Sequence, residues 1–154
     1  MTKEEIKPYV EKYARLYGLK PEIVYGVCVQ ESGLNPYAAR FEPNYKWLFR
    51  PSKVKPLLCS AVTEETCQKI SWGLMQIMGA VFRELGFQGW LTEVLSSIDI
   101  QLDYGCRLLS VKINKYGLHD GILSYNSGSP IKGKDGKFIN EHYYEGVIKH
   151  SQTY

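Results

Sequence analysis

Apolar residues recur at the three- and four-residue spacing of helices along most of the chain. The pattern predicts helices over residues 2–17, 21–33, 80–85, 97–116, 121–126 and 141–150. The longest, 97–116, keeps one apolar face from Ile98 to Ile113 and is expected to be the central buried helix. No stretch alternates clearly enough to predict a strand, although residues 34–70 could contain a small hairpin. The sequence therefore predicts a mainly α fold with little or no sheet.

Capping residues and glycines set the ends of the predicted helices. Thr2 and Glu5 have the spacing of a capping box at the start of the first helix, in which Pro8 is expected to mark a late start or a kink. Gly33 ends the second helix. Asp120 is expected to cap the short helix over 121–126. These signals predict short helices joined by tight turns.

Residues 34–70 break the helical pattern. Four prolines lie in this segment, and one short helix is expected near 45–50. Irregular segments of this length in a compact domain are usually functional. The segment also carries Glu42, which is either a second acid for the site or an exposed loop charge. We interpret 34–70 as an irregular insertion within a single domain that spans 1–154.

One acidic residue is predicted on the buried face of a helix. Glu31 follows Val27 by four residues and Ile23 by eight, so it shares their face near the end of 21–33. Desolvation and the negative end of the helix dipole both favour the protonated carboxyl, which can act as a general acid near neutral pH. The alternative is a solvated glutamate, as most glutamates near helix ends are.

An apolar run over 71–79 contains a glycine and an amide that stand out. Gly73 indicates a close approach of the backbone. Gln76 needs hydrogen-bond partners because it lies among apolar residues. Met75 fits flexible core packing.

The composition is that of one soluble globular domain. The chain has 154 residues, of which 44% are hydrophobic and 23% are charged. No apolar run is long enough to span a membrane, and residues 1–5 lack the apolar core of a signal peptide. The protein is therefore expected to be cytoplasmic, to have lost its signal, or to leave the cell by another route. Its net charge of +3 suits an anionic polymer but is too small and scattered to indicate nucleic acid.

The four cysteines and three histidines do not have the spacing of a metal site, so no metal is expected. Cys28 and Cys106 lie in apolar helical patterns and are expected to be buried. Cys59 and Cys67 bracket a polar loop, and a disulfide between them is an open alternative that depends on an oxidising location. The histidines, at positions 119, 142 and 150, are expected at the surface.

Three separated motifs resemble those of one enzyme family. They are Glu31-Ser32 at a helix end, the run Gly73-Leu74-Met75-Gln76-Ile77, and Tyr125-Asn126 followed by Ser127-Gly128. In this order and separation, over about residues 21–147, they are similar to the soluble lytic transglycosylases of the SLT type, which are related to goose-type lysozymes. The resemblance implies a lysozyme-like fold. It also implies cleavage of the β-1,4 bond between N-acetylmuramic acid and N-acetylglucosamine in peptidoglycan, with formation of a 1,6-anhydromuramic end.

The resemblance implies roles for the first and last motifs. Glu31 corresponds to the single catalytic acid/base, and Ser32 follows it as in the family. Tyr125 corresponds to the tyrosine that holds the glutamate, and Asn126 to the asparagine that contacts substrate. The small residue after this pair is usually alanine, whereas this chain has Ser127.

The resemblance also implies a role for the middle motif. Gly73, Met75 and Gln76 correspond to the segment that lines the glycan cleft in the family. No cofactor is needed for the implied chemistry.

Two other functions remain open from the sequence. Arg40-Phe41-Glu42-Pro43 resembles the phage and tail-associated branch of the family. If Glu42 reaches the cleft, it could position a water and make the enzyme an inverting hydrolase, which needs carboxyl groups about 6.5–9.5 Å apart. A cell-wall-binding or tail module would keep the fold without the chemistry.

The expected partner is the peptidoglycan glycan strand, in the periplasm or cell wall. The protein is expected to be a monomer or part of a larger phage or secretion assembly.

Overall fold

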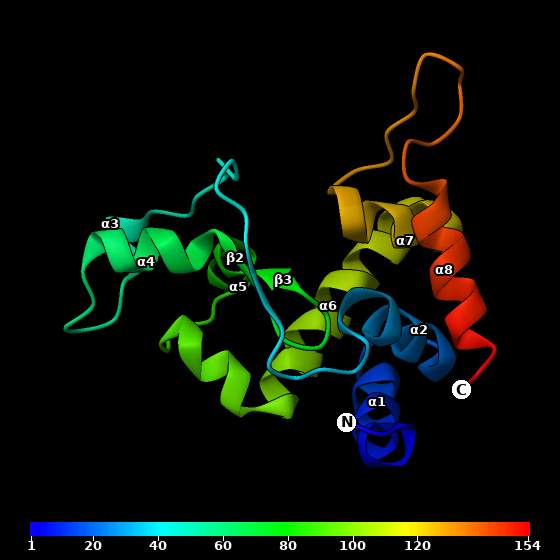
Figure 1. Ribbon diagram of the computed structural model, residues 1–154, viewed down its shortest axis with the longest axis horizontal. Coiled ribbons are helices and arrows are strands. Elements are labelled where there is room, and N and C mark those ends of the chain that lie inside the picture. Colours follow the sequence, from blue (N-terminus) through cyan, green and yellow to red (C-terminus); the bar gives the residue numbers. More distant parts are fainter.

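The computed structural model describes residues 1–154 and contains eight α-helices, one 3₁₀-helix and a three-stranded sheet. In chain order the elements are α1 (Lys3–Leu16), α2 (Pro21–Ser32), β1 (Ala39–Phe41), α3 (Pro51–Val54), α4 (Ala61–Gln68), β2 (Ile70–Trp72), β3 (Ile77–Met78), α5 (Gly79–Glu84), η1 (Leu91–Ser96), α6 (Ile98–Tyr116), α7 (Leu118–Ser127) and α8 (Glu141–Ser151). Helices α1, α2, α7 and α8 gather on one side, and the sheet with α3 to α5 lies on the other (Figure 1). The prediction of a mainly α fold is confirmed.

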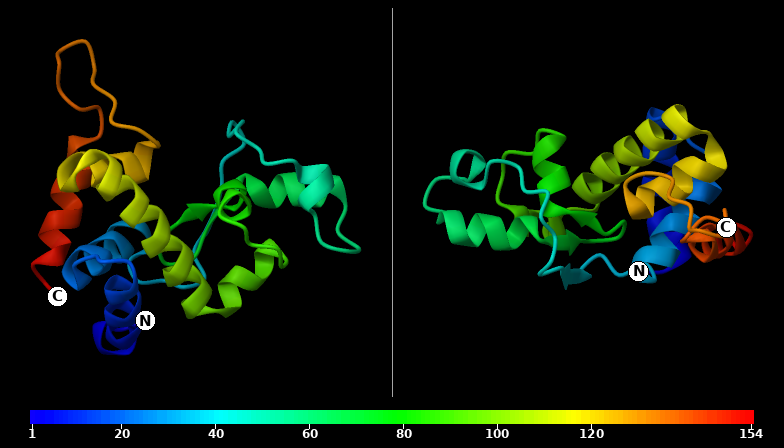
Figure 2. Two further views of the ribbon diagram at one scale, coloured as in Figure 1. Left: turned by 180° about the vertical axis from the view of Figure 1, so that it is seen from behind. Right: turned by 90° about the horizontal axis from the view of Figure 1, so that it is seen from above.

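Helix α6 joins the two sides of the molecule. It packs against α1 and α7 at one side and against η1 at the other, and Figure 2 shows it running between them. Leu102, Cys106 and Leu109 are fully buried along it, so the prediction of a central buried helix is confirmed. Because α2 packs along α8, the first and last thirds of the chain share one core.

The helix ends follow the predicted signals with two exceptions, at Pro8 and at Asp120. Thr2 and Glu5 form both hydrogen bonds of the capping box. Helix α1 begins at Lys3 and contains Pro8, so the late start that Pro8 was expected to mark is wrong. Helix α2 ends at Gly33 in the left-handed conformation, with φ of 59°. The predicted cap at Asp120 is wrong, because α7 already begins at Leu118 and Asp120 lies in its first turn, where an acid suits the helix dipole.

One strand of the sheet lies within 34–70, and the other two lie at or beyond the end of this segment. Strand β1 pairs antiparallel with β2, which pairs antiparallel with β3 in the order β1-β2-β3. The strands have only two or three residues, which is too short for a visible alternation. A hairpin within 34–70 is therefore only half right, since only β1 and the first residue of β2 lie there.

The segment 34–70 also contains two helices that the sequence pattern did not reveal. The helix expected near 45–50 is absent, and α3 begins at Pro51 instead. Helix α4 is capped by Ser60, whose side chain accepts from the backbone N–H of Thr63. Its buried side chains are Glu64 and Gln68, so it has no apolar stripe to indicate a helix.

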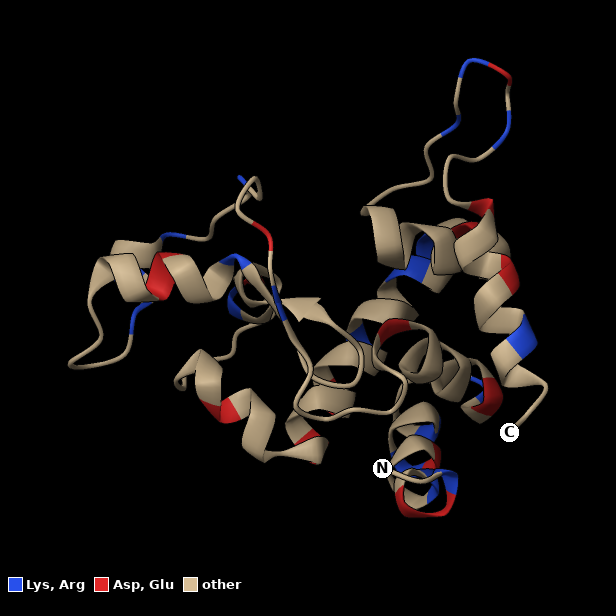
Figure 3. Ribbon diagram, viewed as in Figure 1, with Lys and Arg blue, Asp and Glu red and all other residues tan.

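Acidic and basic residues are mixed on α1, and charges are spread over the other helices (Figure 3). None of the helices combines the length and the apolar character needed to cross a membrane.

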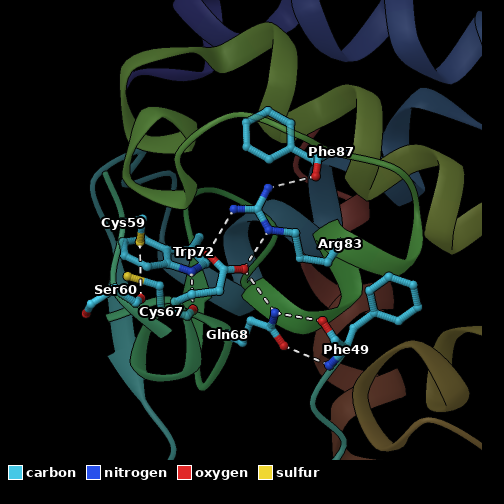
Figure 4. A network of polar contacts seen from close by, with 9 residues as sticks. Phe49, Cys59, Ser60, Cys67, Gln68, Trp72, Arg83 and Phe87 are labelled. Carbon is cyan, nitrogen blue, oxygen red and sulfur yellow. Dashed lines mark hydrogen bonds and ion pairs between the residues drawn. The ribbon is translucent and has the colours of Figure 1, made fainter. Parts of the chain in front are cut away.

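We refer to residues 43–69, which carry α3 and α4, as the arm. A buried ion pair ties the arm to α5 (Figure 4). Arg83 donates from Nε to Glu64 Oε1 at 2.7 Å and from a terminal nitrogen to Glu64 Oε2 at 3.0 Å. Gln68 donates to the same carboxylate at 2.9 Å, accepts from the backbone N–H of Phe49 at 2.7 Å and donates to its carbonyl at 3.0 Å. Charge-assisted hydrogen bonds to the carboxylate of Glu64 therefore hold the arm at its base.

The four cysteines are free thiols in this structure. Cys28 and Cys106 are fully buried, as predicted. Cys59 is also buried and lies with its sulfur 3.5 Å from the carbonyl of Ser60, while Cys67 is half-buried. The disulfide between Cys59 and Cys67, which the sequence left open, is not formed.

Candidate active site

A cleft of about 800 Å³ lies between the helical side of the molecule and the sheet side. Its walls come from the end of α2, from β1 and the segment after it, from the β2–β3 turn, and from α5, α6 and α7. Five predicted site residues line it: Glu31, Glu42, Gln76, Tyr125 and Asn126. The fold therefore brings together residues from three distant parts of the chain.

Glu31 lies in the last turn of α2 and is half-buried. The hydroxyl of Tyr143 donates a hydrogen bond to its Oε1 at 2.6 Å. Burial raises the pKa of Glu31 above its usual value, while the hydrogen bond from Tyr143 and the positive charge of Arg40 oppose part of this rise. The result is a carboxyl that holds its proton to higher pH than a solvated glutamate.

Tyr143 is a site residue that sequence reasoning missed. It lies in α8, is 5% exposed and reaches Glu31 across 112 residues of chain. A buried tyrosine hydroxyl needs a partner, and Tyr143 shares the apolar face of α8 with Val147. That signal predicts a hydrogen bond but cannot identify the acceptor.

Tyr125 does not hold Glu31, contrary to the role that the resemblance implied. Its hydroxyl donates to the backbone carbonyl of Met75 at 2.7 Å. It still lies close enough for the charge of Glu31 to contribute to the raised pKa of Tyr125, after the larger effect of burial. Tyr125 therefore fixes the loop opposite the acid, and Tyr143 positions the acid itself.

Gly73 and Met75 lie behind the cleft wall rather than on it. Gly73 has φ of 72°, and a Cβ there would lie 2.5 Å from the side chain of Gln101. Met75 is 1% exposed and packs so closely on Gly105 that a Cβ at Gly105 would collide with it. The expectation that these two residues line the cleft is wrong; they allow the loop to pack tightly on α6.

Gln101 is a second residue that the sequence did not reveal. It is 1% exposed, accepts from the backbone N–H of Leu74 at 2.8 Å and donates to the carbonyls of Pro36 and Val94 at 3.0 and 2.9 Å. The amide of Gln101 thus uses both of its N–H donors and its oxygen to join two loops and η1 to α6. Its place on an apolar helix face, where a buried amide needs partners, was the available signal.

Ser32 connects the acid-bearing helix to the same loop. Its hydroxyl lies 2.9 Å from the carbonyl of Leu74 and 3.0 Å from that of Cys28 in the preceding turn. It does not line the cleft. Its position is that of a tie between the end of α2 and the loop of the middle motif.

Gln76 lines the cleft, but its amide is engaged within the protein. Its Nε2 donates to the carbonyls of Gly73 at 2.9 Å and Ala38 at 3.1 Å, and its Oε1 accepts from Ser71 at 2.8 Å. The backbone of Gln76 has φ of 47°, a value that residues other than glycine seldom adopt. Gln76 therefore holds the turn between β2 and β3 in shape, with one acceptor position left on Oε1.

Asn126 presents a free donor to the cleft. Its Oδ1 accepts from Asn140 Nδ2 at 3.0 Å, which orients the amide and leaves the Nδ2 group of Asn126 without a partner in the protein. Asn140 also donates to the carbonyl of Leu123 at 3.1 Å, so it is anchored in turn. This arrangement suits an amide that binds a carbonyl or hydroxyl oxygen of a ligand.

Glu42 reaches the cleft but is paired there with Arg40. Arg40 Nε lies 2.6 Å from Glu42 Oε1, and the two side chains are 76% and 38% exposed. The guanidinium of Arg40 therefore occupies one of the two carboxylate oxygens of Glu42. Glu84, at the end of α5, is a further carboxylate of the lining that the sequence did not indicate.

His119 is not the plain surface residue that was expected. Its ring nitrogens lie 2.8 Å from Asp120 Oδ1 and 2.8 Å from Glu141 Oε1, and its ring contacts Tyr144 with centroids 4.4 Å apart. Hydrogen bonds to the two carboxylates raise the pKa of His119. The residue therefore joins α7 to α8, the helix that carries Tyr143.

The structure brings together no group of three or more His, Cys, Asp or Glu side chains suited to hold a metal ion. No curated protein matches the chain. The family model described as the Transglycosylase SLT domain matches residues 8–143. Since this match covers most of the chain and contains Glu31, the cleft and Tyr143, the protein belongs to the Transglycosylase SLT domain family.

Proposed function

We propose that the protein is a peptidoglycan lytic transglycosylase that uses Glu31 as its single acid and base. The main support is the environment of this carboxyl: it is half-buried at the cleft wall, its pKa is raised by burial, and Tyr143 orients it at 2.6 Å. Membership of the family supports the substrate class, which is the glycan strand of the bacterial cell wall.

The first step is proton transfer to the leaving oxygen. The protonated carboxyl of Glu31 gives its proton to the glycosidic oxygen as the bond from the muramic C1 to that oxygen breaks. The N-acetylglucosamine side leaves with a hydroxyl group, and the muramic ring becomes oxocarbenium-like. Because Tyr143 donates to one carboxylate oxygen, it stabilises the negative charge that appears on Glu31 in this step.

The second step closes the anhydro ring. The carboxylate of Glu31 takes the proton from the muramic C6 hydroxyl, and O6 bonds to C1. Glu31 is then protonated again, and no water is consumed. The attacking hydroxyl is already attached to the ring, so it has a high effective concentration relative to free water.

Aromatic and amide groups in the cleft are suited to hold the strand. Trp47 is 64% exposed and contacts Tyr45 edge to face, with ring centroids 5.5 Å apart. An exposed aromatic face in a cleft offers a stacking surface for a sugar ring. The free amide donor of Asn126 on the opposite wall can bind an N-acetyl carbonyl or a hydroxyl group.

A hydrolase that uses Glu42 to activate water is the second candidate, and the observation in its favour is that Glu42 lines the cleft. Its ion pair with Arg40 argues against it. Mass spectrometry of fragments released from purified peptidoglycan distinguishes the two. Anhydromuramic ends, one water lighter than reducing ends, support the transglycosylase, and reducing muramic ends support the hydrolase.

Two substitutions assign the acid. Glu31→Gln should keep the fold and lower turnover at least about 100-fold, because it removes the group that transfers the proton. Glu42→Gln is the matched control at a second cleft carboxylate and should have a much smaller effect. Wild-type activity in Glu31→Gln would rule out the proposed mechanism, and a folded wild-type protein that releases no fragments would favour a binding module.

A further inference from the structure

The end of the arm exposes apolar side chains that have no partner in the molecule. Leu57 is 86% exposed, Leu58 is 91% exposed, and Val62 in the first turn of α4 is 74% exposed. We call these three residues the tip. Leu57 and Leu58 belong to the loop between α3 and α4, which lies at one end of the molecule's long axis (Figure 1), and none of the three residues lines the cleft. The tip therefore has no role in the active site or the core.

The backbone at the tip is held in a conformation that favours glycine. Cys59 donates from its backbone N–H to the carbonyl of Pro56 at 3.1 Å, which closes a four-residue turn. Leu58 is the third residue of this turn and has φ of 66°. A type II turn requires positive φ at that position, where glycine or asparagine is usual. A large apolar residue here is strained and exposed, which argues for a contact outside the chain.

The segment of the chain that precedes the tip is basic. No acidic residue occurs between Glu42 and Glu64, whereas four basic residues do: Lys46, Arg50, Lys53 and Lys55. The last three are exposed, lie on the α3 side of the arm (Figure 3) and form no ion pair. Two exposed leucines flanked by unpaired cations match the pattern that inserts apolar side chains below the headgroups of an anionic lipid surface.

The arm is fixed firmly enough to present the tip. Its base is held by the buried pair of Glu64 and Arg83, and Gln68 bonds both backbone groups of Phe49 (Figure 4). This network joins the two segments of the arm that enter and leave the tip. The tip therefore does not need a partner to become ordered. Less conformational entropy is then lost on binding.

We infer that the tip is a peripheral membrane-binding site that docks the enzyme on an anionic phospholipid surface, with Leu57 and Leu58 inserted among the lipids and Arg50, Lys53 and Lys55 on the phosphates. The inference concerns a surface outside the cleft and does not depend on the proposed reaction. It would place the cleft at a fixed height above a membrane, within reach of the glycan strands nearest to it.

The test is co-sedimentation of the full chain with two kinds of vesicle, phosphatidylcholine alone and phosphatidylcholine mixed with phosphatidylglycerol. The wild type should bind the mixed vesicles and release as salt is raised to about 0.5 M. Leu57→Ser combined with Leu58→Gly should weaken this binding at least about tenfold, because two apolar side chains no longer leave water. The substitution Leu16→Ser, at a residue of α1 that is 64% exposed, is the matched control and should bind as the wild type does.

The substitution Leu58→Gly separates binding from folding. Because Leu58 has positive φ, Leu58→Gly should leave the melting temperature unchanged or raise it while it lowers vesicle binding. Cleavage of soluble glycan fragments should be unchanged. Three results would overturn the inference: no binding of the wild type to mixed vesicles, equal binding by the leucine variant, or self-association through the tip in sedimentation velocity without vesicle binding.

Discussion

At the scale of single residues, the acid is controlled by its neighbours rather than by its helix alone. Glu31 is desolvated, which raises its pKa, and Tyr143 and Arg40 both act in the other direction. The three effects differ in origin. Burial of Glu31 is a property of the fold, whereas the hydrogen bond from Tyr143 and the charge of Arg40 each belong to a single side chain that can be removed. The pH dependence of the reaction should therefore respond to each of them separately.

Activity should fall on the basic side as pH rises through the pKa of Glu31, since the general acid must be protonated. Tyr143→Phe removes a hydrogen bond that favours the carboxylate, so the pKa of Glu31 rises and the basic limb of kcat/KM moves to higher pH. The rate itself should drop about 10- to 100-fold because the carboxyl is no longer held in place.

The matched control for Tyr143 is Tyr25→Phe, at another buried tyrosine, which packs on Tyr154 with ring centroids 5.3 Å apart. It should leave the pH profile unchanged. Arg40→Gln should move the basic limb in the same direction as Tyr143→Phe, because its charge also favours the carboxylate. A shift of either variant to lower pH would contradict the assigned causes.

The residue scale also shows what the sequence could and could not predict about the site. Glu31 was found because helical spacing placed it among Ile23 and Val27, which are buried. Tyr143 was missed because its partner lies 112 residues away, and no local pattern records such a contact. Tyr125 was given the wrong acceptor for the same reason: the resemblance placed the residue at the site but could not say to which group its hydroxyl points.

At the scale of elements, the loop between β2 and β3 depends on a glycine for two separate reasons. Gly73 has φ of 72° and also lies against Gln101, whereas Gly18 has φ of 65° with no atom near its missing Cβ. Gly18→Ala should therefore cost only the left-handed backbone penalty, about 1–2 kcal/mol. Gly73→Ala should cost more and should also lower activity, since the loop carries Gln76. Denaturant unfolding and turnover measure both, and equal losses of stability would show that the contact with Gln101 is unimportant.

The arm offers a second prediction at this scale. Arg83→Met leaves Glu64 buried without its partner and should lower the free energy of unfolding by about 3–5 kcal/mol. The double variant Glu64→Leu with Arg83→Met removes both charges and should cost less than Arg83→Met alone. A double variant that is less stable than Arg83→Met would mean that packing, rather than the unpaired charge, determines the loss.

The contact between α7 and α8 provides a prediction about pH and stability. Asp120 and Glu141 raise the pKa of His119, so its stabilising effect is complete below its unfolded pKa of about 6.5 and is lost as pH rises through the higher folded value. His119→Gln should therefore melt at a lower temperature than the wild type near pH 5.5, with a smaller difference near pH 9. A difference that grows with pH would contradict the ion pairs at His119.

Helices were predictable where their buried face is apolar and not where it is polar. The pattern found α1, α2 and α6 because residues such as Val10, Val24 and Leu102 are fully buried at helical spacing. It missed α4, whose buried side chains are Glu64 and Gln68. The three short strands were missed because each has only two or three residues, which is too few for a visible alternation. Strand β1 also pairs with a distant segment, as in Arg40 with Ser71, and no pattern within the strand records that contact.

At the scale of the whole molecule, the cleft exists because α6 holds two differently built sides at a fixed separation. The helical side contributes Glu31 and Asn126, and the sheet side contributes Gln76 and the aromatic residues after β1. A ligand that contacts both sides should therefore stabilise the fold as a unit. This coupling can be measured without turnover in the Glu31→Gln variant.

Glycan fragments prepared from purified peptidoglycan should raise the melting temperature of Glu31→Gln by about 5–10 °C when the ligand is present at ~100 times its dissociation constant. Asn126→Ala in the same background should need more ligand for the same shift, because the free amide donor on the helical side is lost. Leu118→Ser, at a residue that is 40% exposed and outside the cleft, is the control and should respond as the parent does. A shift in Glu31→Gln that is unaffected by Asn126→Ala would place the glycan on the sheet side alone. No shift in any variant would mean that the cleft does not bind the strand, and the proposed function would then fail at the binding step rather than at the chemistry.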